Sequence, residues 1–123
     1  MYGIYVSDNG CVHYASAIVS GAKQVETRSR NMLKALVGQR VAIIRTRPGR
    51  KPCVVGYATI GKATFCPSAD FQKYFHLHCV QPGSRYDCHG AGKWFYWMEA
   101  PEVCTPYELP PEKVNHGRSW CEF

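Results

Sequence analysis

The chain has 123 residues, 46% of them hydrophobic, which is typical of one folded domain over residues 1–123 and excludes a disordered chain. Its 15 Lys and Arg residues against nine Asp and Glu give a formal net charge of +6. This excess favours polyanionic partners, RNA above all, because contacts to phosphates are largely electrostatic. No stretch resembles a signal peptide or a membrane span, so we expect a cytoplasmic protein with no membrane partner.

The first elements of the chain are a strand and a short helix. Aromatic and β-branched residues over 2–6 predict the strand, and a polar turn follows at 7–10. Apolar residues then recur at helical spacing over 12–19. Gly21 is expected to end this helix, because glycine readily takes the left-handed conformation of a C-cap.

The segment after this glycine changes to a period of two and predicts a short strand. Glu26, Arg28 and Arg30 are expected on one face of this strand, and Thr27 on the other. Lys23 has the opposite parity to Glu26, so it joins that face only if the chain bends before the strand. A glycine cap at the preceding helix end makes such a bend reasonable.

The rest of the chain predicts mainly strands and loops. A strand over 40–46 has apolar residues on both faces, which indicates a central position in a sheet or a closed barrel. The other expected elements are a Pro-Gly turn at 47–52, a returning strand at 53–60 that continues to 66, one or two helical turns at 70–75, a loop at 81–92, an aromatic strand at 93–99, an irregular Pro-rich segment at 101–114 and a short strand at 120–123. Gly56 within the returning strand indicates a bulge or a close backbone approach. These elements favour a small closed or half-closed β-barrel with a flanking helix.

The order helix–Gly–x–Lys–x–x–Glu–x–Arg, formed here by Gly21, Lys23, Glu26 and Arg28, resembles the ASCH domain, a branch of the PUA-like superfamily. The two strands that flank the Pro-Gly turn, and the aromatic strand further on, fit the order of elements in that family. The resemblance implies an α+β fold: a small PUA-like β-barrel of about five to six strands with one or two short flanking helices.

The resemblance also implies a function, because ASCH proteins bind RNA or modified nucleosides in a cleft beside the barrel, lined by this motif. We therefore expect RNA or a nucleotide-like ligand, bound without a cofactor or a metal. The motif supplies charges, and nearby residues are expected to add positive charge or a ring that stacks on a base. The candidate binding residues are Lys23, Glu26, Arg28, Arg30, Arg45, Arg47 and Tyr57.

Three alternatives remain open at this point. The first is a small hydrolase, a modified-nucleoside amidohydrolase or a ribonuclease, in which Lys23 and Glu26 act as acid and base. Amidohydrolases of this family have a Thr three residues after the Lys, where this chain has Glu26, and that difference disfavours the amidohydrolase. The second is a protein-interaction module built on the basic turn and the Pro-rich tail. The third is a purely structural role for the motif, as an ion-pair cluster that fixes the junction of helix and strand.

The cysteines and histidines indicate no further site. Seven cysteines are an odd number without a C-x-x-C pair, so neither a disulfide framework nor a zinc site is predicted. We expect reduced thiols that act as small buried or half-buried hydrophobes. His76 and His78 are two residues apart and are weak candidates for catalysis.

Overall fold

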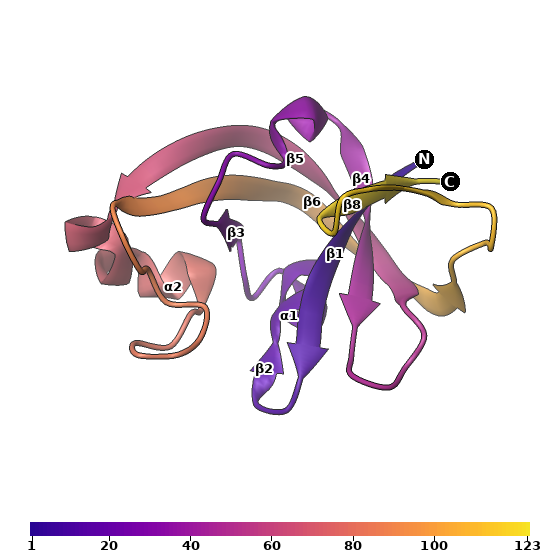
Figure 1. Cartoon of the computed structure of the whole chain (residues 1–123), viewed down its shortest axis with the longest axis horizontal. Coiled ribbons are helices and arrows are strands. Elements are labelled where there is room, and N and C mark those ends of the chain that lie inside the picture. The colour runs from indigo at the N-terminus through magenta and orange to yellow at the C-terminus, as the bar shows by residue number, and fades with distance from the viewer.

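The computed structural model describes all of residues 1–123 and consists mostly of sheet, with two short α-helices and two 3₁₀-helices (Figure 1). The elements in chain order are β1 (Tyr2–Asn9), β2 (Val12–His13), α1 (Tyr14–Ser20), β3 (Val25–Arg28), the 3₁₀-helix η1 (Lys34–Leu36), β4 (Arg40–Thr46), β5 (Cys53–Pro67), the 3₁₀-helix η2 (Ser68–Tyr74), α2 (Phe75–His78), β6 (Gly92–Glu108), β7 (Val114–His116) and β8 (Trp120–Glu122). Neither α-helix has the length or the apolar character needed to cross a bilayer.

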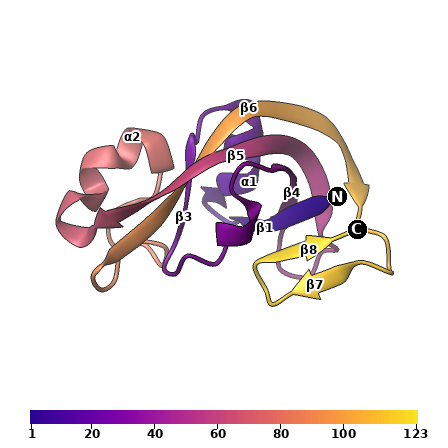
Figure 2. The same ribbon diagram turned by 90° about the horizontal axis from the view of Figure 1, so that it is seen from above.

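The strands form one mixed sheet in the order β3-β6-β5-β4-β1-β8-β7, and β2 pairs with β1 beside this path. Only β1 and β4 run parallel. The long strands β5 and β6 arch over the molecule together, with η2 and α2 at one end and the β7–β8 hairpin at the other (Figure 2).

The sheet differs from the expected barrel in two respects. Its path is open, because the end strands β3 and β7 do not pair with each other, so a closed barrel is not confirmed. It also has eight strands instead of five to six. The additional strands β2 and β7 are two and three residues long, and so short a segment shows no hydrophobic period in the sequence.

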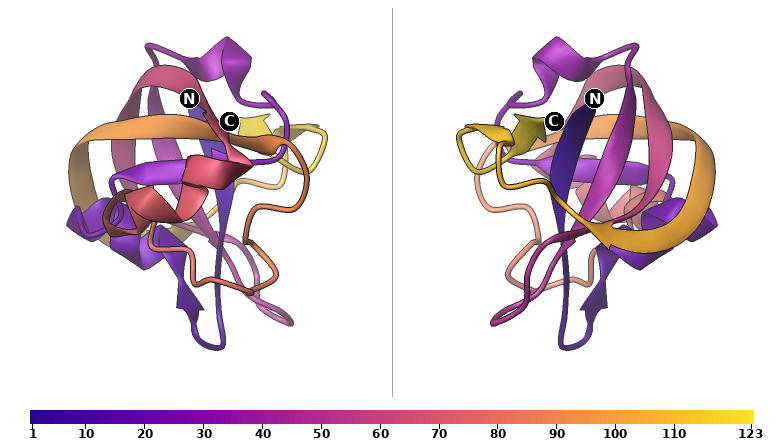
Figure 3. Two further views of the ribbon diagram at one scale, coloured as in Figure 1. Left: turned by 90° about the vertical axis from the view of Figure 1, so that its left-hand side faces the viewer. Right: turned by 90° about the vertical axis from the view of Figure 1, so that its right-hand side faces the viewer.

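The core lies between α1 and the concave side of the curved sheet (Figure 3). Strand β4 is buried on both faces, as its sequence predicts. Val41 and Ile43 belong to the main core, whereas Ala42 and Ile44 belong to a smaller cluster on the other face. Each large aliphatic side chain removed from water in this way contributes about 2 kcal/mol.

Two glycines have the roles in the structure that the sequence predicts. Gly21 has a φ of 87°, and its amide donates to the carbonyl of Ile18, so it caps α1 in the left-handed conformation. Gly56 lies at a shift in the register between β5 and β6. A Cβ atom there would lie 2.1 Å from the carbonyl oxygen of Glu102, which leaves no room for any other residue.

The Pro-rich segment corrects an expectation, because much of it is a strand. β6 extends to Glu108 and includes Pro101 and Pro106. The reason is that β3 pairs with β6 only from Trp94 to Trp97, so beyond that point one edge of β6 is free. A proline whose missing N–H faces a free edge removes no ladder hydrogen bond.

Candidate functional site

The segment between α1 and β3 is held in place by backbone hydrogen bonds at both ends. The amide of Lys23 donates to the carbonyl of Ala17 in α1 at 2.9 Å. The amide of Gln24 donates to Leu77 in α2 at 2.9 Å, and its carbonyl accepts from Met98 in β6. The chain therefore bends before β3, as it must if Lys23 is to join the face of the strand that carries Glu26. The bend turns the side chain of Lys23 toward that of Glu26.

The ammonium group of Lys23 is buried and fully partnered, and the residue is only 1% exposed. Its Nζ donates to the backbone carbonyl of His78, lies 3.7 Å from Oε1 of Glu26, and stands 4.5 Å above the ring of Tyr14. Burial lowers the pKa of Lys23 and outweighs the opposing effect of the Glu26 carboxylate. The side chain of Lys23 is therefore held inside the protein by three separate contacts.

The carboxylate of Glu26 lies between two cations. Its Oε2 accepts from Nη2 of Arg28 at 3.0 Å, and its Oε1 faces Lys23 and accepts the amide of Thr27 at 3.1 Å. The same Nη2 of Arg28 donates to the carbonyl of Tyr5 in β1 at 2.6 Å. The network of Lys23, Glu26 and Arg28, called here the charged junction, thus ties β3 to α2 and to β1.

A cleft of about 530 Å³ adjoins the charged junction. Glu26 and Arg28 line it, whereas Lys23 lies behind them and does not. Thr27, expected on the opposite face, also borders the cleft, because β3 is an edge strand with one side free. The other lining residues are Tyr5, Ser7, Tyr14, Ser29, Met32, Thr46, Pro52, Tyr86, Lys93, Asn115, Gly117 and Arg118.

The aromatic part of this lining consists of three tyrosines from distant parts of the chain. Tyr14 and Tyr86 pack edge to face with ring centroids 5.4 Å apart, and the hydroxyl of Tyr86 donates to Ser7 at 3.1 Å. The hydroxyl of Tyr5 donates to Asn115 at 2.5 Å. Burial raises the pKa of Tyr14 to about 12, so this ring stays neutral at physiological pH. The cleft therefore combines charged groups with rings of the kind that stack on bases.

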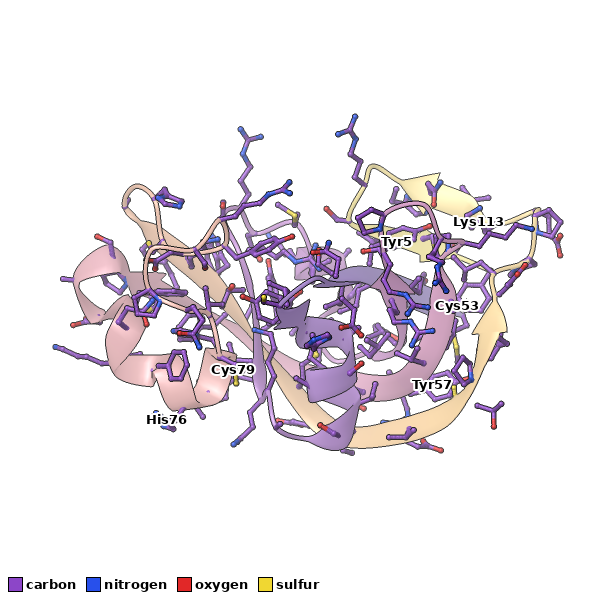
Figure 4. The ribbon with its side chains drawn as sticks, turned by 90° about the horizontal axis from the view of Figure 1, so that it is seen from below. Tyr5, Cys53, Tyr57, His76, Cys79 and Lys113 are labelled. Carbon is purple, nitrogen blue, oxygen red and sulfur yellow. The ribbon has the colours of Figure 1, made fainter.

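Four of the seven candidate residues do not line the cleft: Arg30, Arg45, Arg47 and Tyr57. Tyr57 packs against the smaller cluster on the outer face of the sheet, and its hydroxyl lies 2.7 Å from that of Tyr107. Figure 4 shows Tyr57 well apart from Cys79, whose Sγ donates to the carbonyl of Ala22 next to the charged junction. Strand parity shows which residues share a face, but it does not show which face the cleft occupies.

His78 supports the charged junction instead of facing the cleft. Its imidazole is buried and stacks on Phe71 with centroids 4.1 Å apart. Nδ1 accepts the amide of Val80 at 2.9 Å, so Nε2 donates to the carbonyl of Phe71 at 2.9 Å in the neutral tautomer. Burial lowers the pKa of His78 and favours this neutral form. The ring thereby fixes the end of α2, where the backbone carbonyl of His78 accepts the hydrogen bond of Lys23.

The functional-site candidates that sequence reasoning missed include a second buried lysine, Lys93, at the start of β6. Its only signal in the sequence is a charged residue at the first position of the expected aromatic strand over 93–99. The seven cysteines are all free, two of them buried and four half-buried. No three His, Cys, Asp or Glu side chains are grouped to hold a metal ion.

Searches of protein-family models and of curated proteins found no match to this chain. Among solved structures, the fold is similar to the crystal structure of ASCH from Zymomonas mobilis, with a TM-score of 0.67 and 25% sequence identity. That match covers 87% of this chain and 73% of the other. Two mutants of the Zymomonas mobilis protein match with 26% identity and TM-scores of 0.67 and 0.66, over 87% of this chain and 74% and 76% of theirs.

Proposed function

Given that this chain has an ASCH domain, we propose that it binds RNA or a nucleotide-like ligand in the cleft beside the charged junction. In this proposal residues 1–123 act as one domain. Glu26 and Arg28 face the ligand, and Lys23 holds the Glu26 carboxylate from behind. The observation that supports it most is a buried, ordered charge network that opens onto a cleft with tyrosine rings in its wall.

The chemistry of the exposed groups fits this class of ligand. The guanidinium of Arg28 presents a planar set of donors suited to a phosphate or a base edge, although one nitrogen already serves Glu26 and Tyr5. The Glu26 carboxylate can accept a hydrogen bond from a ligand amine or hydroxyl. The rings of Tyr14 and Tyr86 offer surfaces for a base.

The hydrolase is the second candidate, and the geometry supports it less. A lysine with a lowered pKa beside a carboxylate is an arrangement found in acid–base catalysis. However, Lys23 does not line the cleft, so a substrate there would contact Glu26 and not the lysine. A hydrolase would have to use Glu26 alone, or Lys23 acting through it.

The proposal is tested by fluorescence anisotropy of a short labelled single-stranded RNA, at low and at physiological salt. Arg28→Ala should weaken binding about 10- to 100-fold, which corresponds to the 1.5–3 kcal/mol of a hydrogen bond to a charged group. Arg50→Ala is the matched control, because Arg50 is exposed and does not line the cleft, and it should change the affinity less than about twofold. Thermal unfolding of both variants checks that they are folded.

Two results would contradict the proposal. One is the absence of binding by the folded wild-type protein to RNA and to mononucleotides at either salt concentration. The other is an equal loss in the two arginine variants, which would indicate nonspecific attraction by the positive surface. Turnover of a modified nucleoside, lost in Glu26→Gln, would favour the hydrolase instead.

A further inference from the structure

Lys93 is the one charged residue among the buried ones whose charged group makes no ion pair or hydrogen bond, although its Nζ is not sealed from solvent. It is 8% exposed, lies in β6 opposite Cys66 of β5, and borders the cleft. No carboxylate forms an ion pair with its ammonium group, and no hydrogen bond includes its Nζ.

The other buried polar or charged side chains show how unusual this is. Asp8 accepts from Ser16 at 2.5 Å and pairs with a histidine, Lys23 and Glu26 pair with each other, and both ring nitrogens of His78 are bonded. The ammonium of Lys93 has no such partner within the protein, but it has access to the cleft that Lys93 borders. It is therefore available to bind an anionic group of a ligand.

The charge of the cleft indicates the sign of that partner. Its lining has one carboxylate, Glu26, and three cations, Arg28, Lys93 and Arg118. Glu26 is already paired with Arg28 and with Lys23 behind it, whereas Lys93 and Arg118 form no ion pair. The excess positive charge favours an anionic group in the cleft, and the partly buried position of Lys93 makes its attraction stronger than that of a surface lysine.

We propose that Lys93 binds a phosphate group of the ligand, so that the cleft accepts nucleotides or the RNA backbone in preference to uncharged nucleosides. Arg118, exposed at the rim, adds to the positive field. This inference rests on the proposed function and narrows its ligand class. In the free protein, burial lowers the pKa of Lys93, aided by Arg28 and opposed by Cys88 and by the Glu26 and Asp87 carboxylates. A bound phosphate would oppose the effect of burial and favour the charged form.

The test compares adenosine, adenosine 5′-monophosphate, inorganic phosphate and a short RNA by isothermal titration calorimetry. The wild-type protein should bind the nucleotide at least about tenfold more tightly than the nucleoside, since one charge-assisted contact contributes at least about that factor. Lys93→Gln should weaken nucleotide binding by about the same factor and so remove this preference. Lys34→Gln, at an exposed lysine outside the cleft, should keep the preference.

Two further measurements separate ligand binding from a structural role. Lys93→Gln should be about as thermally stable as the wild type, because the Nζ of Lys93 makes no ion pair and no hydrogen bond within the protein. Saturation with nucleotide should slow the acylation of Lys93 at pH 8, followed by peptide mass spectrometry, and adenosine at saturation should slow it less. If Lys93 is structural, Lys93→Gln will lower the melting temperature and the nucleotide will give no specific protection.

The outcomes distinguish this inference from the proposed function. If the wild type binds nucleoside and nucleotide equally, or if Lys93→Gln keeps the preference, Lys93 does not bind phosphate while the cleft remains a nucleoside site. Binding of inorganic phosphate with no gain from the nucleoside part would indicate an anion site alone and contradict the inference as stated. If the wild type binds none of the four, both proposals fail.

Discussion

The charged junction and the basic turn between β4 and β5 are both rich in cations, but they differ in how far their charged side chains are exposed to solvent. In the junction, Lys23 and Arg28 flank a carboxylate that is 6% exposed. In the turn, Arg50 and Lys51 are exposed to solvent. Lys51 lies 3.7 Å from Glu108, but the two side chains are 77% and 62% exposed.

The difference between these regions shows that the number of cations says little about a site. Exposed ion pairs contribute about 0–1 kcal/mol, because water and salt screen them. Buried charges interact strongly, and each needs a fixed partner or a ligand. A candidate site is therefore better recognised by the charges that the fold buries. This criterion selects Asp8, Lys23, Glu26 and Lys93, together with the half-buried Arg28 that pairs with Glu26.

The largest difference in stability between the two regions is expected when the carboxylate at the centre of the junction is removed. Glu26→Gln keeps the shape of the side chain but leaves Lys23 and Arg28 without a counter-charge. We expect a loss of about 3–5 kcal/mol in the free energy of unfolding, the usual cost of breaking a buried ion pair. Glu108→Gln, which breaks the exposed pair with Lys51, should cost at most about 1 kcal/mol. Urea unfolding measures both.

A double-mutant cycle sharpens this result. The double variant Lys23→Met/Glu26→Gln should be less destabilised than the sum of the single variants by about 1 kcal/mol or more, because Lys23→Met removes a cation that Glu26→Gln leaves without its counter-charge. Equal losses in Glu26→Gln and Glu108→Gln, or strict additivity within the cycle, would show that the junction is no different from the exposed turn.

A smaller effect, visible in the pH dependence of stability, is expected at His78. Its pKa is lowered by burial and by Lys23 and His76, against the opposing effects of the Phe71 carbonyl and of Asp87. The unfolded chain therefore binds a proton at this group before the folded protein does. The contribution of His78 to the free energy of unfolding should be fully present above about pH 6.5, the pKa of the imidazole in the unfolded chain. It should decrease as the pH falls from there toward the lowered pKa of the folded protein.

His78→Phe tests this assignment at constant ring shape. At pH 8 it should cost about 2 kcal/mol, from about 1 kcal/mol for each of the two hydrogen bonds that the phenyl ring cannot form. Below pH 6.5 its stability should decline less steeply than that of the wild type, as followed by urea unfolding across pH 5–8. His76→Gln is the control, because His76 is exposed on the same short helix and is the least of the causes that lower the pKa of His78, so most of the wild-type slope should remain. A wild-type slope in His78→Phe would contradict the assignment.

The charged junction was predictable because its determinants are local in the sequence. The helical spacing, Gly21 and the change to a period of two all lie within residues 12–30. Together they indicate that Lys23 turns toward Glu26 and Arg28, and the contacts in the structure agree. The strand over 40–46 was equally clear, because a segment apolar on both faces has one natural place in a sheet.

The rest of the cleft was not predictable, because it depends on contacts between distant segments. Tyr86, Lys93 and Arg118 reach it only through the pairing of β6 with β3 and the return of the chain to β1 at β8. Tyr57 is the opposite case, because the sequence suggested it for the site and the structure places it outside the cleft. Its aromatic ring suggested base stacking, but the arrangement of the sheet places it on the outer face. The Pro-rich segment was misjudged for the same reason, since only the tertiary structure shows that one edge of β6 is free.

The smallest effect is expected from neutralising the basic turn. This change tests whether the exposed cations contribute to stability or to binding. In Arg47→Ser/Arg50→Ser/Lys51→Ser, the free energy of unfolding should change by no more than about 1 kcal/mol, because all three cations lie at least partly in solvent. If RNA occupies the cleft, its affinity at physiological salt should fall less than about threefold, and the log–log salt slope should decrease by at most roughly 0.7 for each phosphate that the turn no longer neutralises. Anisotropy titrations over a range of salt concentrations measure both quantities. A decrease in affinity of more than about tenfold would place the turn within the binding surface, and the exposed cations would then matter as much as the buried ones.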